Sequence, residues 1–384
     1  MRILSVFGTR PEAVKMAPVV HELKRTADVE SFVCVTAQHR EMLDQVLGLF
    51  GIRPDVDLDL MREDQSLAQL SAAIFTGLDP VLADLNPDWV LVQGDTTTVA
   101  ITSLLSYYRR IRVGHVEAGL RTHDKWQPFP EEINRRVAGV AADLHFAPTE
   151  WARQNLLKEG VPDSAIAVTG NPVIDALQVV AGQPEPEQVT QLLRRLGIAD
   201  KAAPSPNRLI PNYPPPNHLV LVTAHRRENF GQPLENICAA LKELAGRGDV
   251  EIVYPVHLNP NVQEPVYRLL DNVSHITLLP PLDYPALVHL MKRSALVLTD
   301  SGGIQEEAPA FGVPVLVLRD VTERPEGVEA GVLKLVGTDS QLIVRAANRL
   351  LDDAAAYAQM AKAVNPFGDG QAAGRIVRAL IEFH

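Results

Sequence analysis

Short runs rich in valine, isoleucine and leucine recur along the whole chain, and each is followed by a stretch with the spacing of an amphipathic helix. The first series of predicted strands reads RILSVFG, SFVCVTA, WVLVQGD, RVGHVEAG, LHFAPT and IAVTGNP. The second series, from residue 218, reads HLVLVTAH, VEIVYPVH, ITLLPP, ALVLTDSGG and VPVLVLRD. Apolar strands that alternate with helices form parallel sheets covered on both faces. The sequence therefore predicts an α/β protein with two Rossmann-like, doubly wound domains.

The segment between the two series, residues 201–217, contains six prolines and is expected to be a surface loop. Two helical patterns follow the last predicted strand, over residues 340–363. The turn-like NPFGDG then interrupts the chain, and QAAGRIVRALIEF predicts one more helix.

Charge and cysteine content exclude several classes of protein. The net charge of −11 disfavours binding to nucleic acid or to anionic membranes. Cys34 and Cys238 lie in apolar segments and predict buried thiols, not a disulfide framework or a Cys-based metal site. No apolar run approaches the ~20 residues of a membrane span, and the one at the N-terminus is too short for a signal peptide. We expect a cytoplasmic protein.

Ligands of open α/β sheets bind beyond the carboxyl ends of the strands, so polar residues that follow predicted strands are candidates for a site. In FGTRPEAVK, Gly8 allows a tight turn and Pro11 suits the first position of a helix. Arg10 and Lys15 place two cations near that helix start, which favours a phosphate. The alternative is an ordinary solvated first turn with surface cations.

A second candidate is TDSGGIQEEAP, in which Ser301, Gly302 and Gly303 follow a predicted strand and open a helix. Their unhindered backbone N–H groups suit a diphosphate. Glu307 lies one turn further along the same face and could accept hydrogen bonds from ribose hydroxyls. Arg324, near the end of the next predicted strand, could add a charge to the same diphosphate. On its own, S-G-G can mark only a turn.

The third candidate is a set of acid/base groups: Asp95 in VQGDTTT, Glu117 in GHVEAGL, Glu131 in PFPEEINRR and His225 in VTAHRREN. Asp95 could instead be a helix N-cap, and Glu131 could be a first-turn acid that complements the helix dipole. Glu117 is harder to explain structurally, because a carboxylate at the end of a buried strand is costly unless it is paired or used. Together these residues are the parts of an acid/base site.

The usual cofactor motifs are missing from the sequence. There is no G-x-x-x-x-G-K-[ST], and the only G-x-G near-match, GDGQAAG at 368–374, follows helices instead of a first strand. No metal-ligand spacing such as H-E-x-x-H occurs. We therefore predict no ATP or NAD site, no cofactor and no required metal.

The chain resembles the non-hydrolysing UDP-N-acetylglucosamine 2-epimerases of bacteria. The segments that resemble the family are FGTRPEAVKMAPVV, TAQHREMLDQVL, GDTTT, GHVEAGLRT, PEEINRR, YPVHLNPNV, DSGGIQEEAP, RDVTERPEGVEAG and NPFGDGQAAGRI. The resemblance implies the glycosyltransferase-B fold, with two Rossmann-like domains facing a cleft. It also implies an N-terminal domain over 1–172, completed by a C-terminal helix at 368–384 that crosses back, and a UDP-binding domain over 173–367.

By this resemblance Asp95, Glu117, Glu131 and His225 fall on catalytic positions, and Arg10 and Lys15 belong to the active site. The UDP-binding positions it implies are Ser301, Gly302, Gly303, Glu307 and Arg324. Two leucines depart from the family near the uracil: Leu282 stands where some members have Gln, and Leu287 where others can have an aromatic residue. The local contacts to uracil are therefore expected to differ.

The resemblance implies reversible epimerisation at C2 between UDP-GlcNAc and UDP-ManNAc. UDP is eliminated to leave 2-acetamidoglucal and then re-adds, and the product supplies ManNAc for cell-surface polysaccharide. It also implies a homodimer whose ligands are UDP-GlcNAc, UDP-ManNAc and UDP. The alternatives are a UDP-sugar-dependent glycosyltransferase of the same fold, a hydrolysing 2-epimerase that releases free ManNAc, and a two-domain sugar-binding protein.

The resemblance also implies a regulatory contact with UDP-GlcNAc through Gln38, His39, Arg40 and Glu41. The plain alternative for QHREMLDQ is the start of an amphipathic helix with its polar residues in water, which the helical spacing by itself favours.

Overall fold

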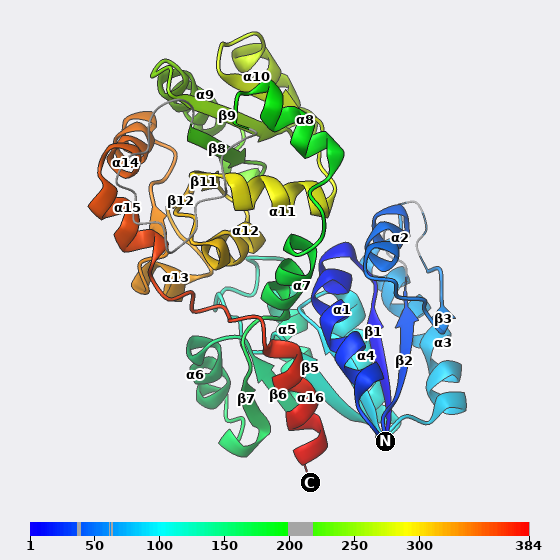
Figure 1. The fold of residues 1–384 in the computed structure, drawn as a ribbon. Helices are drawn as coiled ribbons and strands as arrows, with labels where there is room; N and C mark the ends of the chain where they lie inside the picture. Colours follow the sequence, from blue (N-terminus) through cyan, green and yellow to red (C-terminus); the bar gives the residue numbers. More distant parts are fainter. Residues whose placement is uncertain (37–39, 61, 63, 199–217, 384) are drawn as a thin grey trace. The chain divides into compact units, whose positions relative to one another are not determined.

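Seven parallel strands form the sheet of the first structural unit, which comprises residues 1–176 and 367–384 (Figure 1). Their order is β3-β2-β1-β4-β5-β6-β7, so the direction of winding reverses between β1 and β4. The strands are β1 (Arg2–Phe7), β2 (Glu30–Val35), β3 (Val56–Asp57), β4 (Trp89–Gln93), β5 (Arg112–Val116), β6 (Leu144–Ala147) and β7 (Ile166–Val168). The computed structural model describes residues 1–36, 40–60, 62, 64–198 and 218–383.

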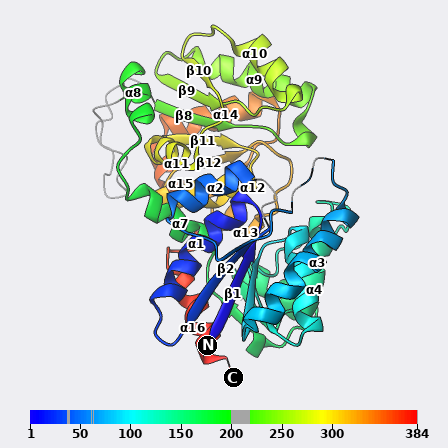
Figure 2. The same cartoon turned by 90° about the vertical axis from the view of Figure 1, so that its right-hand side faces the viewer.

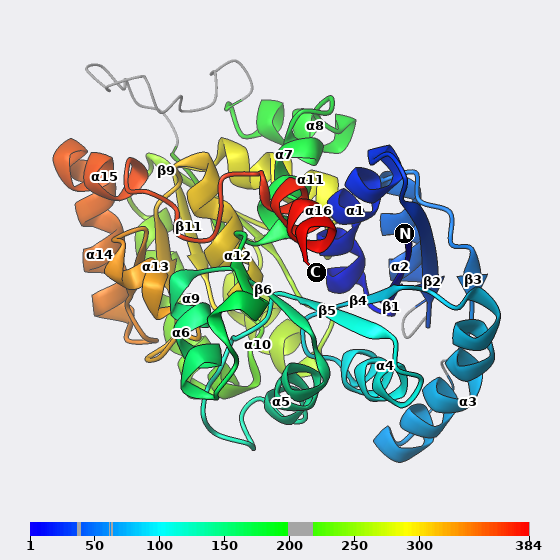
Figure 3. The same ribbon diagram turned by 90° about the horizontal axis from the view of Figure 1, so that it is seen from below.

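Helices cover both faces of this sheet. On one face, leucine, isoleucine and valine side chains of α3 and α4, with Ala138 of α5, pack against β1, β4 and β5. Figure 2 shows α3 and α4 on this face of the sheet. On the other face α1 packs beside α16 (Figure 3). The helices are α1 (Arg10–Arg25), α2 (Arg40–Leu49), α3 (Leu67–Leu85), α4 (Thr97–Tyr108), α5 (Glu131–Ala141), α6 (Glu150–Lys158), η1 (Asp163–Ala165), α7 (Pro172–Ala181) and α16 (Ala372–Glu382). The division between the units falls within α7.

The C-terminal helix is anchored in the first unit by the carboxylate of Asp175, on α7. Asp175 Oδ1 accepts the backbone N–H of Ala373 at 2.9 Å, and Oδ2 accepts that of Ala372 at 3.2 Å. The backbone N–H of Asn171 donates to the carbonyl of Phe367 at 2.7 Å. The helix predicted from QAAGRIVRALIEF is therefore present, and it joins the sheet formed by the N-terminal half of the chain.

The second unit, residues 177–366, contains six parallel strands in the order β10-β9-β8-β11-β12-β13. Its winding reverses between β8 and β11. The strands are β8 (His218–Thr223), β9 (Val250–Pro255), β10 (Ile276–Leu279), β11 (Leu296–Thr299), β12 (Val315–Val317) and β13 (Leu333–Leu335).

Two layers of helices also enclose the second sheet. The core on one face is built by α9, α10 and α14, and the core on the other face by α8 and α11. The helices are α8 (Glu187–Arg195), η2 (Arg227–Asn229), α9 (Gln232–Ala245), α10 (Pro260–Leu270), α11 (Tyr284–Arg293), α12 (Gly302–Glu307), η3 (Ala308–Phe311), α13 (Pro325–Glu329), α14 (Ser340–Asp352) and α15 (Ala354–Ala361).

The predicted α/β class with two doubly wound sheets is confirmed, and each of the eleven predicted runs contains a strand. The sequence missed β3 and β13, which have two and three residues and lie at sheet edges, where one neighbouring strand is enough to define them. The proline-rich segment 201–217 lies outside the described residues. None of the described helices combines the length and the hydropathy needed to cross a bilayer.

Candidate functional site

At the reversal point of the first sheet, the buried carboxylate of Glu12 ties together the loops that follow β1 and β4. Its Oε2 accepts the backbone N–H groups of Gly8 at 2.9 Å and Thr9 at 2.7 Å, and its Oε1 accepts the Thr96 hydroxyl at 2.7 Å. Burial raises the pKa of Glu12, although these hydrogen bonds act in the opposite direction. This carboxylate, which the sequence reasoning missed, fixes the start of the helix that presents Arg10 and Lys15.

Glu117, at the end of β5, is held by three side chains. Its Oε1 and Oε2 lie 2.6 and 2.7 Å from Lys15 Nζ, and Asn171 Nδ2 donates to Oε1 at 2.9 Å. Gln93 Nε2 also donates to Oε2. The backbone of Glu117 has φ +64°, a left-handed conformation that is strained for a residue with a side chain and that is concentrated at functional sites.

Asp95 forms a separate group with α5. Its Oδ2 lies 2.9 Å from Arg135 Nε and 2.7 Å from Arg135 Nη2, and Asn134 Nδ2 donates to its carbonyl at 2.9 Å. Arg135 also contacts Glu132 at 3.3 Å, a carboxylate that is fully buried. The N-cap of α4 is Thr96, so the alternative in which Asp95 caps that helix is wrong.

The loop of Asp95 is also held from the sheet below it. His115 Nε2 lies 2.7 Å from the carbonyl oxygen of Gly94, the residue before Asp95. Burial lowers the pKa of His115 to about 4, so the ring is neutral at pH 7 and donates this hydrogen bond. The loop is therefore fixed by a neutral donor that adds no charge beside Glu117.

Glu131 begins α5, as expected for a first-turn acid. Its Oε2 is buried and has no hydrogen-bond partner among the described residues. A buried oxygen without a donor is uncommon, and it leaves this carboxylate able to accept a proton or a hydrogen bond from a ligand. The side chain of Arg10, at the first position of α1, likewise forms no hydrogen bond or ion pair within the described part of the chain.

At the reversal point of the second sheet, Asp300 follows β11 and faces the loop after β8. Asp300 Oδ2 accepts the backbone N–H groups of His225 and Arg226, both at 2.8 Å, and Asn229 Nδ2 at 3.0 Å. The His225 ring stacks on that of His257, with 5.2 Å between centroids. The pKa of His225 is lowered, because burial outweighs the opposing charge of Asp300.

The turn formed by Ser301, Gly302 and Gly303 opens α12, and the first N–H groups of a helix have no partner inside it. Two guanidinium groups lie beside this turn. A Cβ built on Gly302 would be 3.5 Å from Arg226 Nη2 and 3.6 Å from Arg324 Cζ. Arg226 was not predicted, although it neighbours His225 in HRREN. The arrangement of N–H groups and cations suits a diphosphate.

The other predicted residues of the second unit have defined surroundings. Arg324 Nε donates to the buried Glu306 at 2.6 Å. The Tyr284 hydroxyl donates to Glu307 Oε1 at 2.9 Å, which holds that carboxylate in place. Leu282 packs against the apolar core between α8 and α11, and Leu287 lies half-buried on α11.

The structure does not test the predicted regulatory contact with UDP-GlcNAc through residues 38–41. Gln38 and His39 lie outside the described residues. Arg40 and Glu41 begin α2, which agrees with a helix start, and their contacts are not described. Regulation through these four residues stays a prediction.

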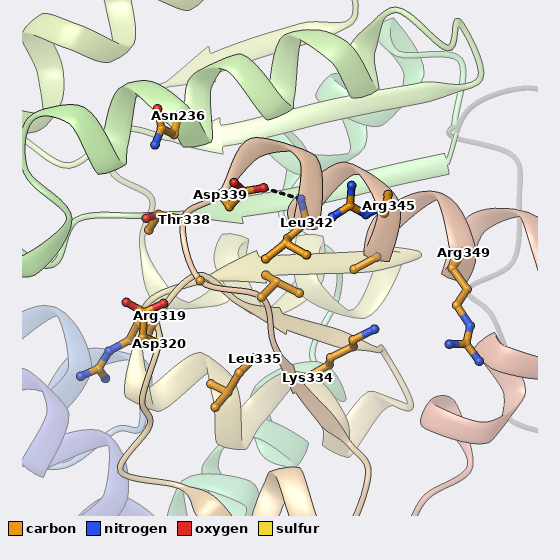
Figure 4. Close-up of a pocket in the computed structure, with 13 residues that line it drawn as sticks. Asn236, Arg319, Asp320, Lys334, Leu335, Thr338, Asp339, Leu342, Arg345 and Arg349 are labelled. Atoms are coloured by element: carbon orange, nitrogen blue, oxygen red, sulfur yellow. Dashed lines mark hydrogen bonds between the residues drawn. The ribbon is translucent and has the colours of Figure 1, made fainter.

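A cavity of about 720 Å³ lies between the ends of β12 and β13 and the start of α14 (Figure 4). Arg319, Lys334, Arg345 and Arg349 line it, and Asp339 caps α14 by accepting the Leu342 N–H at 2.8 Å. None of the predicted site residues lies in its lining. Among the described residues there is also no cluster of His, Cys, Asp and Glu placed to hold a metal ion.

Comparison with known proteins gives one consistent result. A sequence model described as UDP-N-acetylglucosamine 2-epimerase matches residues 21–381. The chain is 54% identical to UDP-N-acetylglucosamine 2-epimerase of Escherichia coli over 99% of this chain and 98% of that protein.

Two solved structures extend the comparison. One is UDP-GlcNAc 2-epimerase of Neisseria meningitidis bound to UDP-GlcNAc, with TM-score 0.88, 46% identity and 100% of both chains covered. The other is the enzyme of Methanocaldococcus jannaschii in complex with UDP-GlcNAc and UDP, with TM-score 0.78, 31% identity and 99% of both chains covered.

The contact between Lys15 and Glu117 leads to a prediction about stability. Lys15→Met should lower the free energy of unfolding by about 2–4 kcal/mol, because Glu117 would remain buried without its cation. Adding Glu117→Gln should recover at least about half of that loss, since a neutral amide no longer needs the cation. Urea denaturation at neutral pH measures both values. A loss below about 1 kcal/mol for Lys15→Met, or no recovery in the double variant, would contradict this interpretation of the pair.

Proposed function

The chain belongs to the UDP-N-acetylglucosamine 2-epimerase family, and we propose that it interconverts UDP-GlcNAc and UDP-ManNAc by inverting C2 of the sugar. Sequence identity of 54% over almost the whole length of a named epimerase carries this proposal. The contacts within each unit support it, because the second unit has groups suited to a diphosphate and the first has carboxylates suited to proton transfer.

The chemistry requires a way to labilise the C2 hydrogen, which is not next to a carbonyl group. Elimination provides it: C2 loses a proton while the bond from C1 to UDP breaks, leaving 2-acetamidoglucal and UDP. UDP then re-adds to C1 while a proton is delivered to the other face of C2. Because each face exchanges a proton, more than one acid/base group is needed. Departure of UDP is favoured by donors and cations at the diphosphate.

We assign proton transfer to Asp95, Glu117 and Glu131 together. Lys15, Gln93 and Asn171 keep the Glu117 carboxylate oriented, and Arg135 does the same for Asp95.

We assign UDP binding to the second unit. The turn from Ser301 to Gly303, with Arg324, binds the diphosphate, and His225 donates to it as it departs. Arg10 adds a further charge to the anionic substrate. Glu307, oriented by Tyr284, accepts hydrogen bonds from the ribose. Leu282 and Leu287 lie near the uracil, where they offer apolar contact in place of an aromatic ring or an amide.

The proposal is tested by incubating the purified protein with UDP-GlcNAc in D2O and following the sugar by NMR. We expect a mixture of UDP-GlcNAc and UDP-ManNAc with deuterium at C2, because elimination and re-addition exchange that proton with solvent. Retention of the original hydrogen in UDP-ManNAc would exclude the mechanism. Free ManNAc as the main product would identify a hydrolysing epimerase, and turnover only with an added acceptor would identify a glycosyltransferase.

The division of roles between the units is tested by two kinds of variant. Asp95→Asn or Glu117→Gln should lower turnover by ~10²-fold or more with UDP affinity largely kept. Arg324→Ala should weaken UDP binding by ~1.5–3 kcal/mol. Because Arg324 also pairs with buried Glu306, the binding comparison uses Glu306→Gln as its background. Calorimetry that shows UDP binding abolished by Asp95→Asn and unchanged by Arg324→Ala would reverse the assignment.

We also propose that the chain forms a homodimer through α4 and α5. Tyr107 and Tyr108 are exposed at the end of α4, and Val140 at the end of the neighbouring α5 is 90% exposed. Large apolar side chains exposed on two neighbouring helices suit an interaction surface between copies of the chain. Val140→Glu should shift the sedimentation of the protein toward the monomer, whereas Val364→Glu, at an 83% exposed valine of the second unit, should not. Equal sedimentation of both variants would contradict this interface.

We further infer a cytoplasmic location, which cell fractionation tests. Both cysteines, Cys34 and Cys238, are free and buried, which suits a reducing compartment.

A further inference from the structure

The two carboxylate oxygens of Asp300 differ in their hydrogen bonds. The side chain is fully buried, and Oδ2 accepts three hydrogen bonds, from the backbone N–H groups of His225 and Arg226 and from Asn229 Nδ2. Oδ1 is equally buried and has no hydrogen-bond partner among the described residues. It lies 3.6 Å from Nδ1 of His225, just beyond hydrogen-bonding distance.

This geometry has a consequence for the imidazole. A buried carboxylate oxygen without a donor is costly, and His225 Nδ1–H is the group placed to satisfy it after a small shift. A neutral His225 therefore carries its proton on Nδ1, which leaves Nε2 without one. In that state Nε2 can accept a hydrogen bond but cannot donate one to a phosphate oxygen. Donation from Nε2 requires the doubly protonated ring.

The charges around His225 make double protonation of its ring depend on whether an anion is bound nearby. Asp300 favours the imidazolium, whereas burial and the two neighbouring groups, His257 and Arg226, disfavour it. An anionic diphosphate at the turn from Ser301 to Gly303 would add negative charge next to the same loop and favour the imidazolium. Proton uptake and diphosphate binding are then linked, so each strengthens the other.

We propose that Asp300 is a positioning residue that keeps the His225 proton on Nδ1 and lets the ring take up a second proton, on Nε2, when the diphosphate of UDP binds. The proton comes from solvent, and no covalent bond other than N–H forms. The charged ring then donates to the diphosphate as it leaves C1. This inference rests on the proposed nucleotide site and adds to it the protonation state of the group that assists departure.

Asp300→Asn is a close test, because the amide oxygen can still accept the three donors now bound to Oδ2. The NH2 group would then replace Oδ1 and face His225 Nδ1, which favours the opposite tautomer and opposes the imidazolium. Asp339→Asn is the matched control: Asp339 also accepts a backbone N–H, at the start of α14, and asparagine caps helices equally well.

Proton uptake is measured by titrating UDP calorimetrically, near pH 7.5, in buffers with different ionisation enthalpies. His225→Gln reports the change in protonation of UDP itself and is the reference. Relative to it, the wild type and Asp339→Asn should take up about half a proton or more per UDP bound. Asp300→Asn should bind UDP with that difference reduced to near zero. UDP affinity of the wild type should fall as pH rises through the pKa that His225 has in the UDP complex, because the complex then loses the proton that favours binding. In Asp300→Asn this fall should occur at lower pH.

Each outcome has a separate meaning. Equal uptake by Asp300→Asn and the wild type would overturn the role of Asp300, whereas a wild type that does not bind UDP at all would overturn the nucleotide site itself. NMR of wild-type protein labelled with ¹⁵N-histidine gives an answer even if Asp300→Asn does not fold. We expect a proton on Nδ1 of free His225 and protons on both nitrogens with UDP bound. A free ring protonated on Nε2 would contradict the proposal.

Discussion

Both units of the chain depend on one kind of interaction: a buried carboxylate that accepts two backbone N–H groups of one loop and one further side-chain donor. In the first sheet Glu12 binds the N–H groups of Gly8 and Thr9, and the Thr96 hydroxyl after β4. In the second, Asp300 after β11 binds those of His225 and Arg226, and the Asn229 amide. Each carboxylate joins loops from two strands at the point where the winding reverses. Arg10, Asp95, His225 and the turn from Ser301 to Gly303 lie in or directly after those loops.

The balance of energies explains why these anions can be buried. Removing a carboxylate from water costs several kcal/mol, and a hydrogen bond to a charged group returns about 1.5–3 kcal/mol. Three such bonds therefore offset most of the cost. The pKa of Glu12 is still raised, which indicates that the hydrogen bonds do not fully compensate for the loss of water. The Lys15 contact with Glu117 follows the same rule, with two amides as additional donors. The loops are thus fixed in position before a ligand arrives, which is the condition for electrostatic stabilisation of a departing diphosphate.

The sequence was sufficient for the fold class and for the strand ends, because continuous apolar runs and the residues that follow them are local patterns. Glu117 could be singled out since a carboxylate ending a buried strand needs a partner. Its pairing with Lys15 could not be predicted, although both residues were named, and the partners of the other predicted residues were missed. Arg135 sits in an ordinary amphipathic helix, and Arg226 and Asp300 adjoin predicted residues without any motif of their own. Their contacts join segments 40 to 75 residues apart, and only the three-dimensional fold brings such segments together.

The central claim is that the bond from C1 to UDP breaks and re-forms during catalysis. Positional isotope exchange tests this directly, with UDP-GlcNAc that carries ¹⁸O in the bridge between C1 and the β-phosphorus. If UDP is eliminated and its β-phosphate can rotate before re-addition, the label in recovered UDP-GlcNAc moves from the bridge into the non-bridging oxygens. NMR of phosphorus resolves the two positions. Label that stays in the bridge of UDP-GlcNAc and UDP-ManNAc, together with retention of the original hydrogen at C2 in D2O while the epimers reach equilibrium, would contradict the account.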